Sequence, residues 1–510
     1  MASTFVRNSV VNALAGIFTT LGGFMSTIVV ARLLGVQGTG IVAFATWAVT
    51  VSIIIADLGI TGTLSRFLPE LLARHEVEEA GRLTRVLLGS FFACTFVIAA
   101  SFWLYAGWLI WRAPLQASAP LTPETYTVSP IFWILVGGAC LAQSMANFAN
   151  SWLKGHQDFA ALARVAAFAC LVQILGTAVG AMAFGVIGAL CAMALGSLVP
   201  ISMLSRVEPL GGRIDAVLRR RVTRFSLETW GGYLLTAFFA SRMEVFFLER
   251  SWGSHAVGLF TVSLTLSNLA TQGPLLLTGA LLPRLSQHVG RDEQSEARAV
   301  YAASIPLMAL VLFPACLGTA AIAPVLLPMM YGHAFEPAIT TATILLTSAA
   351  FVTSTSIASV FLIAMERTRF LLASALCGAA LSILAGVTIV PAFGPVAAAF
   401  SRGGVQFAIA AVTLWYLRRH LDCPTPFGIL ARLLAAAALC AVVARLIVIE
   451  VPSLGGMIVA IVAGAATYAA ALRLLRPLLP RDVEKLRTAV LILPRHLRPA
   501  VHFGMQLILA

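Results

Sequence analysis

The chain has 510 residues, of which 59% are hydrophobic and 11% are charged, and its mean hydropathy is +0.93. A soluble domain cannot bury this much apolar surface, so the composition excludes a water-soluble protein and indicates a polytopic membrane protein. The formal net charge is +13, but most of the 34 basic residues fall between apolar runs on one side, which is the positive-inside pattern and excludes nucleic acid as a partner.

Windows of about 20 apolar residues predict an all-α protein with about 14 transmembrane helices. The basic loops place both termini in the cytoplasm, with only short loops outside. From their order we expect five regions, which are an N-terminal six-helix bundle over 1–210, a basic cytoplasmic linker over 211–224, a second six-helix bundle over 225–420, an extra helix pair over 421–475 and an interfacial tail over 476–510.

The second predicted span carries one acid, Asp57, near its inner end. Buried acids in membrane helices are candidates for coupling to protons or cations. Helix capping, or an ion pair with the basic 65–85 segment, is the structural alternative and the favoured one.

The fourth predicted span carries a polar stripe on one helical face, with Gln143, Asn147 and Asn150 followed by Ser151 and Lys154. Amides both donate and accept hydrogen bonds, which suits sugar hydroxyls. The stripe is therefore a candidate cavity lining. Hydrogen bonds between neighbouring helices are the alternative.

The seventh predicted span, 225–248, contains Arg242 and Glu244. A charge at such a depth usually faces a bundle interior or a wet cavity. The guanidinium of Arg242 suits a diphosphate, although an interior ion pair or an anchor at the outer surface would also explain it. Glu244 is either a structural ion-pair partner or a weak candidate for ion coupling.

Two sequence echoes indicate an internal repeat. Ala31-Arg-Leu-Leu-Gly35 and the following Gly40 correspond to Glu249-Arg-Ser-Trp-Gly253 and Gly258 at one constant offset. Likewise, Ala183-Phe-Gly185 corresponds to Ala392-Phe-Gly394. The second bundle therefore repeats the first.

The twelfth predicted span contains Arg402, next to Gly403 and Gly404. It is a candidate second cation of a substrate cavity, or else a partner for a carboxylate in span seven or an interfacial anchor.

Chemistry of other kinds is not indicated. No phosphate-binding loop of the Gly-x-x-x-x-Gly-Lys kind, no metal-ligand spacing and no nucleophile elbow occurs in the sequence. We therefore expect no cofactor, no metal and no enzymatic activity.

Three turns carry a family resemblance: Ala31–Gly40, the Asp57–Arg66 segment and Val390–Ala398. With the span count and the repeat, they resemble the Wzx-type polysaccharide flippases of the multidrug/oligosaccharidyl-lipid/polysaccharide exporter superfamily. The resemblance implies two bundles around a central cavity and a monomer in the bacterial inner membrane. It also implies export of an undecaprenyl-diphosphate-linked oligosaccharide for O-antigen, capsule or exopolysaccharide, with membrane lipids and the polysaccharide polymerase and chain-length machinery as partners.

Three other functions compete with this hypothesis. A drug or cation antiporter of the same superfamily would be expected to stop at twelve spans and to carry several buried acids. A murein-precursor flippase of the same superfamily is the second alternative within transport. A membrane polymerase or ligase would need a large outer catalytic loop, which the sequence lacks.

Overall fold

The computed structural model describes residues 2–112, 127, 129–207, 214–240, 243–276, 285, 293–354, 356–365, 367–423 and 425–475. These residues form α-helices and two short 3₁₀ helices, which confirms the predicted all-α class. Ten of the described helices are long and apolar enough to cross a membrane. Three of them, α1 (Ala2–Asp57), α5 (Phe159–Ile201) and α13 (Val390–His420), contain a glycine turn, so the number of crossings remains a prediction.

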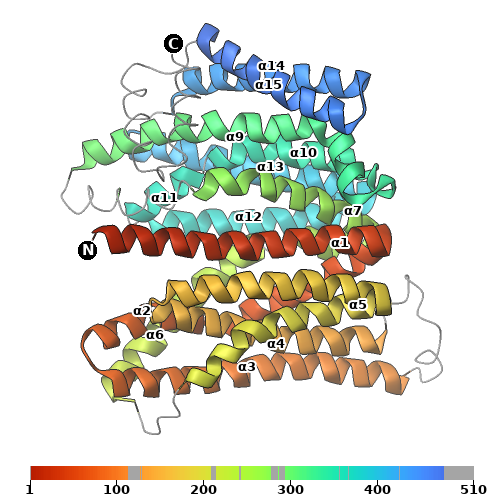
Figure 1. Ribbon diagram of the computed structural model, residues 1–510. Coiled ribbons are helices and arrows are strands. Elements are labelled where there is room, and N and C mark those ends of the chain that lie inside the picture. The colour runs from red at the N-terminus through yellow and green to blue at the C-terminus, as the bar shows by residue number, and fades with distance from the viewer. Residues whose placement is uncertain are drawn as a thin grey trace. The chain divides into compact units, whose positions relative to one another are not determined.

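The chain divides into two compact units, Met1–Thr261 with Gly386–Gly394 and Val262–Ala385 with Pro395–Ala510. The predicted boundaries between the two bundles, at residues 210 and 225, remain a prediction. The helices of unit 1 are α1 (Ala2–Asp57), α2 (Ile60–Ala73), α3 (Val77–Arg112), α4 (Pro130–Gly155), α5 (Phe159–Ile201), η2 (Ser202–Arg206), α6 (Ala216–Ala240) and the first part of α7 (Met243–Leu276). Within this unit α3, α4 and α5 pack side by side (Figure 1).

Unit 2 contains the rest of α7 and the remaining helices. They are α9 (Gln294–Tyr331), η4 (His333–Phe335), α10 (Ala338–Ser354), α11 (Ser356–Ala364), α12 (Thr368–Thr388), α13 (Val390–His420), α14 (Phe427–Glu450) and α15 (Leu454–Leu475). The C-terminal end of α12 and the start of α13 are assigned to unit 1. Here α9 lies against α10, α14 and α15. Buried Leu312, Phe313 and Cys316 of α9 pack against Leu433 and Ala436 of α14.

Four glycines interrupt long helices in the same way. Gly35, Gly185, Gly253 and Gly394 have φ of 66°, 59°, 72° and 66° with ψ between −134° and −178°. This backbone region is essentially confined to glycine. The two sequence echoes therefore mark one backbone conformation that is used four times.

The turn at Gly185 reverses the chain. Gly180 and Gly188 contact each other backbone to backbone, and Gly196 lies beside Gln173. Along an uninterrupted helix, Gly180 and Gly188 would be separated by about 12 Å. The two limbs of α5 are therefore an antiparallel hairpin, which small residues allow to pack closely.

Matching turns also pack in matching pairs. Val30 beside the Gly35 turn clusters with Ala181 and Ala189 beside the Gly185 turn. In the second pair, the Trp252 indole packs on Gly394 and donates a hydrogen bond to the carbonyl oxygen of Pro391 at 3.1 Å. An internal duplication predicts that equivalent turns pack in equivalent pairs.

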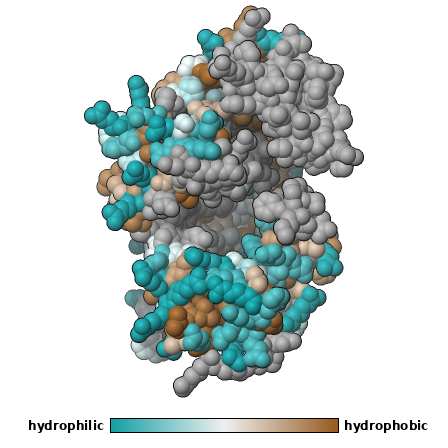
Figure 2. All heavy atoms as spheres, turned by 90° about the vertical axis from the view of Figure 1, so that its left-hand side faces the viewer, coloured by the Kyte–Doolittle hydropathy of each residue, from teal (hydrophilic) through white to brown (hydrophobic). Residues whose placement is uncertain are grey.

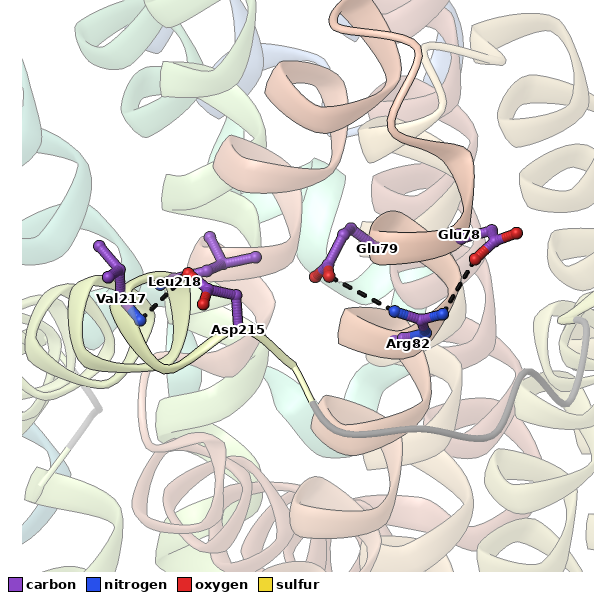
Figure 3. A network of polar contacts seen from close by, with 6 residues as sticks. All are labelled: Glu78, Glu79, Arg82, Asp215, Val217 and Leu218. Carbon is purple, nitrogen blue, oxygen red and sulfur yellow. Dashed lines mark hydrogen bonds and ion pairs between the residues drawn. The ribbon is translucent and has the colours of Figure 1, made fainter.

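Polar residues fix the starts of α3 and α6. Arg82 lies between Glu78 and Glu79, at 2.9 and 3.5 Å, and the carboxylate of Asp215 accepts hydrogen bonds from the backbone N–H groups of Val217 and Leu218 (Figure 3). The Asp215 bonds satisfy two free donors of the first helical turn.

Figure 2 views the side of the molecule that lies at the left of Figure 1, where hydrophilic residues gather.

Candidate functional site

Unit 1 contains a cavity of about 960 Å³, formed by α1, α2, α4 and α5. Each long helix segment that lines it contributes residues at the three- and four-residue spacing of a single helical face. The stripes are Asn12, Ala15, Gly16, Thr19 and Thr20; Thr50, Ile53, Ile54 and Asp57; Gln143, Ala146, Asn147, Asn150, Ser151 and Lys154; Leu162, Val165, Ala166, Ala169, Cys170 and Gln173; and Met193, Gly196, Ser197 and Pro200, with Thr61 from α2.

The α4 wall of this cavity is polar over almost its whole length. The side chains of Gln143, Asn147 and Asn150 make no hydrogen bond to any other residue that the structure describes. Asn147 is exposed, and the other two are half-buried. The three amides therefore face space that water reaches, and their donors and acceptors are available to a ligand.

A different polar stripe shows what structural hydrogen bonding looks like in this protein. On α7, Ser263 donates to the carbonyl oxygen of Ala338 at 3.0 Å, and Ser267 donates to that of Leu345 at 3.3 Å. These bonds join α7 to α10 inside unit 2. Interhelical bonding thus explains the α7 hydroxyls and does not explain the α4 amides.

Hydroxyls on the other walls are partly satisfied by their own helices. Thr19, Thr20 and Thr50 each donate to the carbonyl oxygen four residues earlier, at 3.0, 3.0 and 2.7 Å. Each oxygen can still accept a hydrogen bond. The first limb of α5 contributes mainly apolar residues, so the cavity has a polar wall and an apolar wall.

Asp57 lies in the cavity lining and also fixes the turn between α1 and α2. Its carboxylate oxygens accept hydrogen bonds from the backbone N–H and the hydroxyl of Thr61, at 3.2 and 3.0 Å. The turn continues through Leu58 and Gly59, both with positive φ. The structure thus shows a capping contact for Asp57, while its role in ion coupling stays a prediction.

Side chains of α6 hold the same turn. Ser226 donates to the carbonyl oxygen of Leu58 at 2.6 Å, and the Trp230 indole N–H donates to that of Ile54 at 3.1 Å. A side chain at Gly59 would collide with the carbonyl oxygen of Ser226. The end of the cavity that contains Asp57 is therefore built on a turn that α6 packs against directly.

The remaining predicted site residues lie elsewhere. Glu244 is buried at the start of α7 in unit 1 and is not part of the cavity lining. Arg402 is half-buried on α13 in unit 2. Arg242 lies outside the described residues. The structure therefore brings together Gln143, Asn147, Asn150 and Asp57, and the binding roles of all seven residues remain predictions.

Sequence reasoning missed several lining residues. Asn12 precedes Gly16, Thr19 and Thr20 at helical spacing on the first span, and this pattern matches the one on span four. Comparing polar stripes between spans could have found it. Gln173 is a single polar residue in an apolar run, and only the folded hairpin shows that it lines the cavity.

No group of three or more His, Cys, Asp or Glu side chains in the described part of the chain could hold a metal ion. The described lining of the cavity also contains no aromatic residue. The chemistry that this cavity offers is hydrogen bonding by amides and hydroxyls, with one ammonium and one carboxylate.

Solved structures of low sequence identity share this fold. The lipid II flippase MurJ in an inward closed conformation is 12% identical, with a TM-score of 0.73 over 91% of this chain and 98% of that chain. An inward-facing multidrug resistance MATE family transporter of the MOP superfamily is 14% identical, with a TM-score of 0.63 over 81% and 98%. A MOP superfamily transporter from Pyrococcus furiosus is 14% identical, with a TM-score of 0.55 over 82% and 95%.

No curated protein matches the sequence. A family model described as polysaccharide biosynthesis protein matches residues 5–289, which is more than half of the chain. The resemblance read from the glycine turns is thereby confirmed. The chain is a multi-pass membrane protein that has the MurJ- and MATE-like fold and belongs to the polysaccharide biosynthesis protein family.

Proposed function

We propose that this protein is a flippase that moves a polyprenyl-diphosphate-linked oligosaccharide from the cytoplasmic to the outer leaflet of the bacterial inner membrane. Family membership supports a step in polysaccharide biosynthesis, and the shared fold supports transport by alternating access. The product would serve surface polysaccharide such as O-antigen, capsule or exopolysaccharide.

The observation that carries the proposal is the α4 wall. Three amides line a cavity of about 960 Å³ without a hydrogen bond to another described residue. Unsatisfied polar groups inside a membrane protein are costly unless water or a ligand satisfies them. Sugar hydroxyls both donate and accept, and amides match them in both senses.

Other parts of the lipid-linked molecule need other surroundings. A diphosphate calls for cations, and Arg242 and Arg402 stay our candidates for this group. The polyprenyl chain would remain in the lipid during transfer. Asp57 and Glu244 are the candidates for coupling to an ion gradient.

A drug or cation antiporter is the second candidate, because a multidrug transporter shares the fold and Asp57 lines the cavity. A cationic drug would favour acids and aromatic faces. The described lining has a single acid, bonded to Thr61, and no aromatic ring. The cavity therefore suits hydroxylated ligands better than aromatic cations.

Transport in vesicles tests the proposal. Purified protein is reconstituted with a polyprenyl-diphosphate-linked oligosaccharide, and the fraction of sugar exposed on the outer leaflet is followed with an impermeant sugar-modifying reagent. The double variant Gln143→Ala/Asn147→Ala should slow transfer at least about tenfold, since each lost hydrogen bond is worth about 1 kcal/mol.

The matched control is Asn268→Ala, which removes an amide from α7, outside the cavity. It should leave the transfer rate within about twofold of wild type, which is well under 1 kcal/mol. Expulsion of a cationic dye without any transfer of lipid-linked sugar would favour the antiporter and reject the proposal. Transfer confined to the murein precursor would assign the protein to the other flippase class.

A further inference from the structure

The cavity of unit 1 has one basic residue in its described lining, Lys154, at the end of the α4 polar stripe. Lys154 follows Asn150 by four residues and so continues the face that carries Asn147 and Gln143. Along α4 it lies about 16 Å from Gln143, at 1.5 Å per residue. The cavity therefore has a charged end and a long uncharged part.

Lys154 and Asp57, the one acid in the described lining, differ in their hydrogen bonds. The carboxylate of Asp57 accepts two hydrogen bonds from Thr61. The ammonium of Lys154 is exposed and forms no ion pair or hydrogen bond with the described residues. Of the two charged side chains in the described lining, Asp57 is hydrogen-bonded within the protein and Lys154 is not.

A purely structural role at the end of α4 explains why a cation is present there, but it does not explain the helical face on which Lys154 lies. A lysine in the last turn of a helix is favoured by the helix dipole, because the negative C-terminal end of the helix attracts a cation. That effect does not depend on which face the side chain occupies. It does not explain why Lys154 continues the stripe of unbonded amides.

We infer that Lys154 is a specificity-determining residue that binds an anionic group of the transported ligand while the amides bind its uncharged hydroxyls. The inference rests on the proposed function and names the chemistry of its substrate, an oxyanion next to a hydroxylated segment. Two sources supply such a group: the carboxylate of an acidic sugar, and the phosphate that joins the sugar to the lipid. A lysine ammonium binds either one as a point charge.

The experiment uses two synthetic lipid-linked oligosaccharides that differ only in their last sugar, glucose in one and glucuronate in the other. Initial transfer rates are measured over a range of lipid concentrations for wild type, Lys154→Gln and Lys154→Arg. The control is Arg164→Gln, which removes a cation from α5 that is not part of the cavity lining. Thermal unfolding of each variant checks folding.

We expect Lys154→Gln to lower transfer of the glucuronate lipid relative to the glucose lipid about tenfold, because the variant loses a charge-assisted hydrogen bond to the carboxylate. Lys154→Arg should restore transfer. An equal loss for both lipids, again restored by arginine, would support binding of the phosphate instead. Unchanged transfer of both lipids by Lys154→Gln would overturn the inference.

The outcome also separates this inference from the function on which it rests. If wild-type protein transfers neither lipid, the flippase proposal fails. If wild type transfers both and the amide variants slow both, the flippase proposal stands whatever the result at Lys154.

Discussion

Gly35 shows how one residue can divide a long apolar helix. Its φ of 66° and ψ of −167° divide a helix of 56 residues. Without this turn the helix would extend about 84 Å, far more than the roughly 30 Å of a bilayer core. A side chain at Gly35 would meet no atom within 4 Å, so a substitution there tests the backbone conformation alone.

Gly35→Ala should destabilise the protein by about 1–3 kcal/mol, because alanine must be held in a backbone region that only glycine occupies easily. Gly23→Ala is the control, since Gly23 lies in the same helix, has no positive φ and also has open space around it. Thermal unfolding in detergent should show a lower midpoint for Gly35→Ala alone. Equal midpoints for both variants would contradict the assigned role of the turn.

At the scale of helices, a polar and aromatic contact joins α2 to α6. Arg221 makes a bidentate contact with Glu70 at 2.8 and 3.2 Å, and the Arg66 guanidinium lies 4.4 Å from the centre of the Phe225 ring. The hydrogen bond from Arg221 lowers the pKa of Glu70 below its ordinary value of 4.5. The ionised carboxylate of Glu70 therefore binds Arg221 more strongly than the protonated carboxyl group does.

This pKa direction predicts a pH dependence. Because the folded-state pKa of Glu70 is lowered, its contribution is complete above about pH 5 and is lost as the pH falls through the folded-state value. The contact is partly exposed, so we expect it to stabilise α2 docking by no more than about 1 kcal/mol. Glu70→Gln should speed amide hydrogen exchange in α2 at pH 7 and have a smaller effect near pH 3.

The control for this prediction is Glu228→Gln, which breaks the Arg224–Glu228 pair within α6 and leaves the contact with α2 intact. Exchange in α2 should not change in this variant. An effect of Glu70→Gln that is equally large at both pH values would show that charge is not the cause.

How much the sequence predicts depends on whether a feature is local. The glycine echoes are visible because one backbone conformation demands one residue type, and the α4 stripe is visible because three amides share a helical face. The cavity itself depends on how five helix segments pack, which no local pattern encodes. Gln173 and the contact of Asp57 with Thr61 therefore appear only in the folded protein.

At the scale of the whole molecule, the glycine turns and basic loops together predict the orientation. The positive-inside pattern places the turn near Glu76 and the segment near Asp422 in the cytoplasm. The same pattern places η4 near His333, and the α14–α15 turn near Ser453, outside. These positions connect helices whose bounds the structure gives.

Single cysteines in a cysteine-free background test this orientation in intact spheroplasts. A membrane-impermeant maleimide should label His333→Cys and Ser453→Cys, and it should label Glu76→Cys and Asp422→Cys only after the membrane is opened. Labelling of Asp422→Cys in intact spheroplasts would mean that the number of spans between residues 333 and 422 has been predicted wrongly.

The reversal inside α5 has a consequence for biosynthesis. One glycine separates two apolar limbs that contact each other at Gly180 and Gly188, and no polar stretch lies between them. The ribosome therefore delivers both limbs to the translocon in close succession, with nothing hydrophilic to hold the first in place before the second emerges. We expect such limbs to leave the insertion channel together, as a preformed pair.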